Sequence, residues 1–115
     1  MTVTIYHNPR CSKSRQTLSL IEERGLKPKV IAYLESPPSA AEMDAILKKL
    51  GKEPREVMRR KEEPYAALGL DDPKKTRAAL IKAMVENPIL IERPIVLSKG
   101  KAVLGRPPEA VLDIL

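Results

Sequence analysis

The sequence predicts an α/β fold with a mixed sheet of about four strands. Three observations predict it. Strand-like runs at residues 2–6 and 30–34 flank a helical stretch, helical patterns fill the middle of the chain, and two apolar runs near its end are joined by a glycine-containing turn. This order predicts a βαβ unit, a helical insertion, and then a β-hairpin followed by a helix. A chain of 115 residues suits one domain, 1–115.

The first strand and the first helix are separated by a polar turn. Residues 2–6 alternate and are β-branched or aromatic, which favours a half-buried strand, and an Asn-Pro pair then stops it. From Ser12 the chain can turn helical as far as Gly25, a residue type suited to closing a helix. We therefore expect Cys11 to lie at a helix N-terminus.

The next strand and helix follow directly. Residues 30–34 form a continuous apolar run of the kind buried in the middle of a sheet, and a right-handed crossover would make this strand parallel to the first. Ser39 and Glu42 read as a capping box that opens an amphipathic helix, and Gly51 ends this helix. Pro54 suits the first residue of another short helix.

The rest of the chain contains shorter elements. Pro94 can only start a strand or lie at its edge, because it lacks the N–H that a ladder requires. The remaining elements are expected in this order: loop or single-turn material at residues 62–65 and 69–73, a helix at 74–86, an antiparallel hairpin at 94–97 and 101–105, and a short helix at 109–115.

Composition excludes several classes of protein. The net charge of +6 requires nucleic acid to be considered, but three tyrosines are too few aromatic residues for base stacking, and 15 acidic residues are interspersed with the basic ones. No run approaches the ~20 apolar residues of a membrane span, and we expect no signal peptide because the first apolar run ends after a few residues. A single cysteine fits a reducing compartment. We expect a cytoplasmic protein with no nucleic-acid or membrane partner.

Residues 6–15 contain the only cysteine and the only histidine, together with basic side chains. A thiolate is the nucleophilic form of cysteine, and free N–H groups at a helix start stabilise it and could also bind an oxyanion. The alternative for Cys11 is a small buried hydrophobe, which the polar, basic neighbours disfavour. The alternative for His7, a loop histidine bonded to backbone, stays open.

The stretch 7–15, His-Asn-Pro-Arg-Cys-Ser-Lys-Ser-Arg, resembles the active-site loop of the glutaredoxin-coupled arsenate reductases, the ArsC family. Three later pieces match this family in order: Arg59 six residues before Tyr65, Glu-Arg-Pro-Ile-Val at 92–96, and Gly-Arg-Pro at 105–107. The four pieces together cover essentially the whole chain. The resemblance implies a thioredoxin-like fold with a helical insertion between the βαβ unit and the hairpin.

The resemblance also implies the roles of individual residues. Cys11 would be the nucleophile, and His7 would help to keep its sulfur ionised. Arg59, Arg93 and Arg106 would bind the oxyanion as substrate and serve in catalysis, since guanidinium forks stay charged and can donate from several directions.

Further residues of the site follow from the same resemblance. The peptide before Pro94 would be cis and would face the cysteine, which would place Arg93 next to Cys11. Ser14 and Arg15, near the start of the first helix, are expected to be additional substrate-binding donors. No bound cofactor and no metal are expected.

The implied reaction is the reduction of arsenate to arsenite in arsenic detoxification. Cys11 would displace an oxygen of arsenate to form a covalent thiol-arsenate. Ser14 stands where a Cys-x-x-Cys protein would have its second cysteine, so the electrons must come from outside. The family implies glutathione as co-substrate and glutaredoxin as partner, and we expect a monomer.

Two alternatives to this function remain open. One is a family member that acts on another oxyanion or on a thiol conjugate, because an arginine trio recognises charge and shape and not the element. The other is a redox-responsive regulator that binds a protein partner, since the same superfamily has a regulator branch. That branch senses through a Cys-x-x-Cys pair, which this chain lacks.

Overall fold

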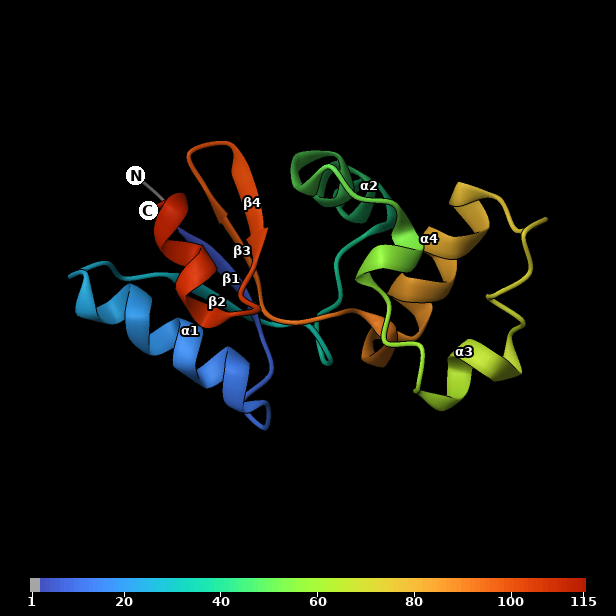
Figure 1. Cartoon of the computed structure of the whole chain (residues 1–115), viewed down its shortest axis with the longest axis horizontal. Coiled ribbons are helices and arrows are strands. Elements are labelled where there is room, and N and C mark those ends of the chain that lie inside the picture. Colours follow the sequence, from blue (N-terminus) through green and yellow to red (C-terminus); the bar gives the residue numbers. More distant parts are fainter. Residues whose placement is uncertain (1–2) are drawn as a thin grey trace. The chain divides into compact units, whose positions relative to one another are not determined.

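The computed structural model describes residues 3–115, so Thr2 of the predicted first strand lies outside the described residues. The contacts divide into two compact units (Figure 1). The first combines the described part of Met1–Ser36 with Arg93–Leu115, and the second is Pro37–Glu92. The expected organisation as one domain stays a prediction. Within the described residues no helix is long and apolar enough to span a membrane.

The first unit contains a four-stranded sheet with the strand order β2-β1-β3-β4. Its strands are β1 (Thr4–His7), β2 (Lys29–Ala32), β3 (Ile95–Ser98) and β4 (Lys101–Leu104). β1 runs parallel to β2 and antiparallel to β3, and β3 runs antiparallel to β4. The mixed sheet, the parallel βαβ unit and the C-terminal hairpin are thereby confirmed.

The prediction that residues 30–34 lie in the middle of the sheet is wrong. β2 pairs with β1 alone among the described strands and forms an edge, where Val30 is 48% exposed. A continuous apolar run does not determine how many neighbours a strand has, and here β1 and β3 are the interior strands. Tyr33, which follows the strand, is the buried residue of this run, with 1% of its surface exposed.

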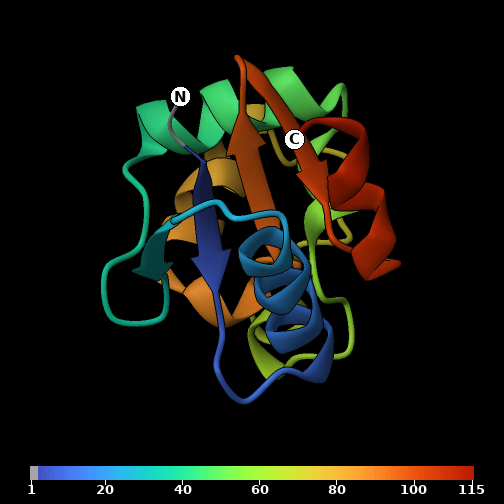
Figure 2. The same ribbon diagram turned by 90° about the vertical axis from the view of Figure 1, so that its left-hand side faces the viewer.

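Two helical elements cover one face of the sheet in the first unit. They are α1 (Ser12–Glu23) and the C-terminal 3-10 helix η3 (Pro108–Asp113), which pack against each other in front of the strands in Figure 2. α1 begins immediately after Cys11, and Gly25 follows its end with φ +77°, as predicted. The predicted last helix is present as this 3-10 helix.

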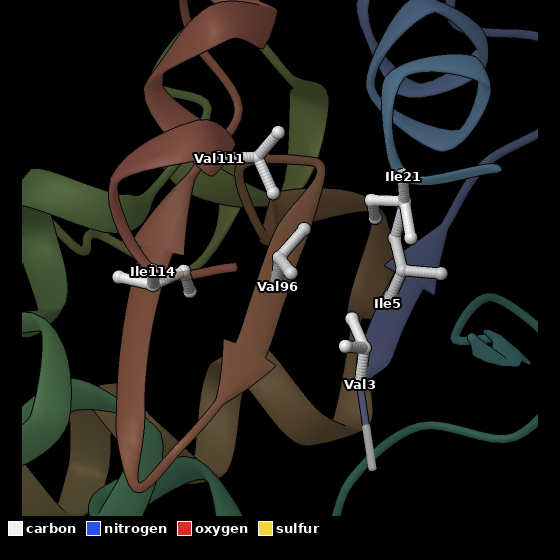
Figure 3. Close-up of a cluster of buried hydrophobic side chains, with 6 residues drawn as sticks. All are labelled: Val3, Ile5, Ile21, Val96, Val111 and Ile114. Atoms are coloured by element: carbon white, nitrogen blue, oxygen red, sulfur yellow. The ribbon is translucent and has the colours of Figure 1, made fainter. Parts of the chain in front are cut away.

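The core of the first unit joins this face of the sheet to the two helices. Ile5 of β1 lies opposite Val96 of β3, and Ile21 of α1 is completely buried above them. Burial of each such side chain is worth about 1.5–3 kcal/mol. The cluster therefore fixes the position of α1 on the sheet, and its members are drawn in Figure 3: Val3, Ile5, Ile21, Val96, Val111 and Ile114.

The second unit consists of helices. The capping box is confirmed, because Ser39 Oγ accepts from Glu42 N at 3.1 Å and Glu42 Oε1 accepts from Ser39 N at 2.9 Å. The helix predicted from residue 74 begins later, at Arg77, because Thr76 caps it. The elements are α2 (Ala40–Leu50), η1 (Pro54–Val57), α3 (Glu63–Ala67), α4 (Arg77–Glu86) and η2 (Pro88–Leu90).

Candidate active site

Cys11 occupies the N-cap of α1, at the end of the turn that follows β1. Its N–H donates to the Asn8 carbonyl at 3.0 Å and closes the turn, and its carbonyl accepts from Arg15 N at 3.0 Å and starts the helix. Only 9% of the Cys11 surface is exposed. The sulfur thus lies at the positive end of the helix dipole, as the sequence predicted.

The surroundings of Cys11 favour its thiolate. Burial raises the pKa of the Cys11 thiol, but hydrogen bonds from the Ser14 backbone N–H, from the Arg93 side chain and from the Lys13 backbone N–H act in the opposite direction, together with the Arg93 charge. Their combined effect outweighs burial, so the pKa of Cys11 lies below its ordinary value. A larger share of the group is therefore in the nucleophilic form near neutral pH.

Two arginines from the ends of the hairpin converge on the sulfur. Arg106 Nη2 donates to Cys11 Sγ at 3.6 Å, and Arg106 Nε donates to the Arg93 carbonyl at 2.7 Å. The peptide before Pro94 is cis, as the resemblance implied, and the peptide before Pro107 is cis as well. Arg93 Nε is buried and has no hydrogen-bond partner within residues 3–115. An oxyanion beside the sulfur is the kind of acceptor that such a donor requires.

His7 and Ser14 form a buried polar pair at the base of the loop. His7 Nδ1 lies 2.6 Å from Ser14 Oγ, which also accepts from Asn8 N at 3.0 Å. Burial, and after it the charge of Arg15, lowers the pKa of His7, so the imidazole is neutral at neutral pH. Any help of His7 to the thiolate would therefore act through hydrogen bonding and not through charge, and this help stays a prediction.

Arg15 and Ser14 hold the loop in shape. Arg15 Nη1 donates to the Pro9 carbonyl at 2.8 Å, across the turn that carries Cys11. The Ser14 hydroxyl is bonded within the same loop. The expected role of both residues as substrate-binding donors stays a prediction.

Arg59 belongs to the second unit. Its backbone N–H donates to the Leu90 carbonyl at 2.7 Å, and its guanidinium joins two carboxylates. Nε lies 3.3 Å from Glu62 Oε1, and Nη1 lies 3.3 Å from Glu92 Oε1. The prediction that Arg59 binds the oxyanion together with the groups around Cys11 stays a prediction.

Sequence reasoning missed one close approach that shapes the site. A Cβ atom on Gly105 would meet Thr17 Oγ1 of α1 and would lie 2.7 Å from Pro94 Cγ. Gly105 N also donates to the Pro94 carbonyl at 2.9 Å. The absence of a side chain at Gly105 therefore lets the end of β4 lie directly on α1, just before Arg106. The Gly-Arg-Pro motif was visible in the sequence, but nothing in it indicated Thr17.

The described residues contain no group of three or more His, Cys, Asp or Glu side chains that could hold a metal ion. The groups that the structure brings together here are the Cys11 sulfur and the cationic donors around it. A cysteine at the start of the first helix of such a sheet is typical of thioredoxin-like thiol proteins. The family model for the ArsC family matches residues 6–114, and the chain belongs to this family.

Relatives of known sequence and structure agree with this membership. The chain is 51% identical to the arsenate reductase of Haemophilus influenzae, with 100% of both chains covered. It is 56% identical to the uncharacterized protein YfgD of Escherichia coli, over 98% of this chain and 96% of that one. The solved structure of an arsenate reductase from Vibrio cholerae matches with a TM-score of 0.97 at 54% identity, over 100% of this chain and 98% of the other. The thioredoxin-like fold is thereby confirmed.

Proposed function

We propose that this protein is an arsenate reductase that uses Cys11 as its nucleophile and takes electrons from glutathione through glutaredoxin. The observation that carries the proposal is the convergence of Arg106 and Arg93 on the Cys11 sulfur. A thiolate and two guanidinium groups provide both the attacking atom and the charge that an arsenate oxyanion needs. The relatives named arsenate reductase, at about half identity over the whole chain, favour arsenate among the oxyanions.

The first step joins sulfur to arsenic. The Cys11 thiolate attacks arsenic with its electron pair, an S–As bond forms, and one As–O bond breaks. The departing oxygen takes up protons and leaves as water, while arsenic stays in its +5 state. Arg93 and Arg106 would hold the remaining oxygens and stabilise their charge, and Arg59 belongs to this set in the proposal.

The second stage reduces arsenic by two electrons, which a chain with one cysteine cannot supply from a dithiol pair of its own. The Cys-x-x-Cys position holds Ser14, whose hydroxyl is bonded to the loop. Two external thiols must therefore become one disulfide. In sum, one arsenate and two glutathione molecules give one arsenite, one glutathione disulfide and one water. Glutaredoxin would catalyse the exchange of the mixed disulfide that Cys11 forms on the way.

An assay of arsenite formation tests this proposal. The wild-type protein is supplied with arsenate and with glutathione, glutaredoxin, both or neither, and Cys11→Ser is the matched control. We expect sustained turnover only with both components, and loss of turnover in Cys11→Ser, because a hydroxyl is a far weaker nucleophile than a thiolate. Turnover supported by thioredoxin alone, or retained in Cys11→Ser with its circular dichroism unchanged, would contradict it.

A further inference from the structure

Thr17 lies on α1, one helical turn after the residues that face the Cys11 sulfur. Its side chain is completely buried, and its Oγ1 donates to the Lys13 carbonyl at 2.8 Å. That carbonyl belongs to the same planar peptide group as the N–H of Ser14. The Ser14 N–H is in turn a hydrogen-bond donor to the Cys11 sulfur. One peptide group therefore connects the Thr17 hydroxyl to the thiolate.

Hydrogen bonds in such a chain strengthen one another. A donor at the carbonyl draws electron density through the conjugated C–N bond, which makes the N–H on the other side of the peptide a stronger donor. The Lys13 carbonyl already has the backbone of α1 as a partner, so the Thr17 hydroxyl is an additional donor. Threonine often forms this bond inside helices, and the bond alone would indicate no special role.

A second contact, with Gly105, distinguishes Thr17 from other helical threonines. Its Oγ1 occupies the space that a Cβ on Gly105 would enter, and its Cγ2 would lie 3.1 Å from that atom. Gly105 directly precedes Arg106, which donates to Cys11 Sγ at 3.6 Å. Thr17 is therefore linked to both groups of donors at the sulfur: to the Ser14 N–H through the Lys13 carbonyl, and to the Arg106 guanidinium through Gly105.

We propose that Thr17 is a positioning residue for the Cys11 thiolate, with its hydroxyl polarising the Lys13–Ser14 peptide and its buried side chain setting the distance between α1 and the strand end that carries Arg106. The inference rests on the proposed role of Cys11 as the nucleophile. It concerns the thiolate itself and is the same for any substrate.

The test compares two pairs of proteins, and within each pair the side chain at position 17 differs by the presence of a hydroxyl. Wild type is compared with Thr17→Val, and Thr17→Ser with Thr17→Ala. The rate of iodoacetamide alkylation of Cys11 is measured against pH in each protein, without arsenate. We expect loss of the hydroxyl to raise the titration midpoint of Cys11 by about 0.3 pH units in both pairs. This shift corresponds to the fraction of the Ser14 N–H···sulfur hydrogen-bond energy that cooperativity with the Thr17 hydroxyl would add.

The charged and titratable groups of these elements stay the same in every variant. They are Arg93 and Arg106 at the hairpin ends, the titratable His7, and Arg10, Lys13 and Arg15 in the loop and α1. Ser19→Ala, which removes an exposed hydroxyl from the same helix, is the control and should keep the wild-type midpoint.

Circular dichroism and thermal unfolding show which variants are folded. If Thr17→Val does not fold, the comparison of Thr17→Ser with Thr17→Ala alone shows whether the hydroxyl lowers the titration midpoint of Cys11. An unchanged midpoint in both pairs would overturn the proposal, as would an equal rise in Thr17→Ser and Thr17→Ala. Because no arsenate is present, these results stand apart from the turnover assay, which tests the proposed function by itself.

Discussion

Arg106 donates a hydrogen bond to the sulfur of Cys11 at 3.6 Å, although 95 positions separate the two residues in the chain. The contact is possible because β1 and β3 are neighbours in the sheet, so the loop after β1 and the ends of the hairpin belong to the same unit. Arg106 is itself held by the Arg93 carbonyl. Each part of the site therefore depends on the others for its position.

Substitution of Arg93 by lysine should remove most of the arsenate reductase activity although the charge is kept. A lysine ammonium is a point charge and cannot replace the planar fork that acts on Cys11 and would bind an oxyanion. Steady-state kinetics with varied arsenate check this, and Arg24→Lys on an exposed site is the matched control. Activity of Arg93→Lys equal to that of the control would show that Arg93 does not bind the substrate.

The low pKa of Cys11 predicts a pH-dependent difference in stability between the wild type and Cys11→Ser. The thiol has a lower pKa in the folded chain than its ordinary value, which it has in the unfolded chain. Between the two values the unfolded state holds a proton that the folded state has released, so stability rises with pH across this window and then levels off.

Urea unfolding at a series of pH values measures this difference. The free energy of unfolding of the wild type should rise relative to that of Cys11→Ser as pH increases toward the ordinary thiol pKa. All other titratable groups are shared, so their contributions cancel. A difference that stays flat, or that falls with pH, would show that the folded site does not favour the thiolate.

Gly105→Ala should destabilise the protein and weaken its activity together. The added Cβ would meet Thr17 and Pro94, both of which are buried and cannot move without disturbing the site. Overpacking of this kind costs about 1–3 kcal/mol. Thermal unfolding gives the loss of stability, and the apparent affinity for arsenate gives the displacement of Arg106. Wild-type values in both measurements would mean that α1 and the end of β4 can move apart at no cost in stability or arsenate affinity.

Arg59 and Arg60 provide a matched pair of neighbouring arginines. Arg59→Ala should weaken the binding of arsenate, because the proposed function includes Arg59 in the oxyanion-binding set. Arg60→Ala should be close to neutral, since Arg60 is exposed and its Nη2 donates to the Arg55 carbonyl at 3.4 Å. Arsenate affinities of the two variants decide the matter. An essential Arg60 beside a dispensable Arg59 would show that the match is displaced by one residue.

Local rules were sufficient for the parts of the site that are contiguous in sequence. The strand, the Asn-Pro stop and the helical signals from Ser12 together predicted that Cys11 lies at a helix start, and Ser39 predicted its capping box. These features depend on neighbours a few residues apart, whose spacing is visible in the chain.

Features that depend on distant partners could not be predicted in this way. The edge position of β2 depends on which strands β1 pairs with, and apolar content does not determine that. The contact of Thr17 with Gly105 likewise arises only after α1 has packed on the sheet. The bond between His7 and Ser14 was also not visible, because it joins a strand end to the first turn of the helix.

The intact mass of the protein, measured when the reaction is stopped midway, tests the role of Cys11 most directly. Wild-type protein is incubated with arsenate and glutathione but without glutaredoxin, and then analysed by mass spectrometry. With one cysteine, the chain has no second thiol to release what Cys11 binds. We expect a monomer that carries one adduct on Cys11, either arsenic or glutathione. Glutaredoxin should then remove this adduct, and Cys11→Ser should never form it. Unmodified protein, or a disulfide-linked dimer as the main competent species, would contradict this role of Cys11.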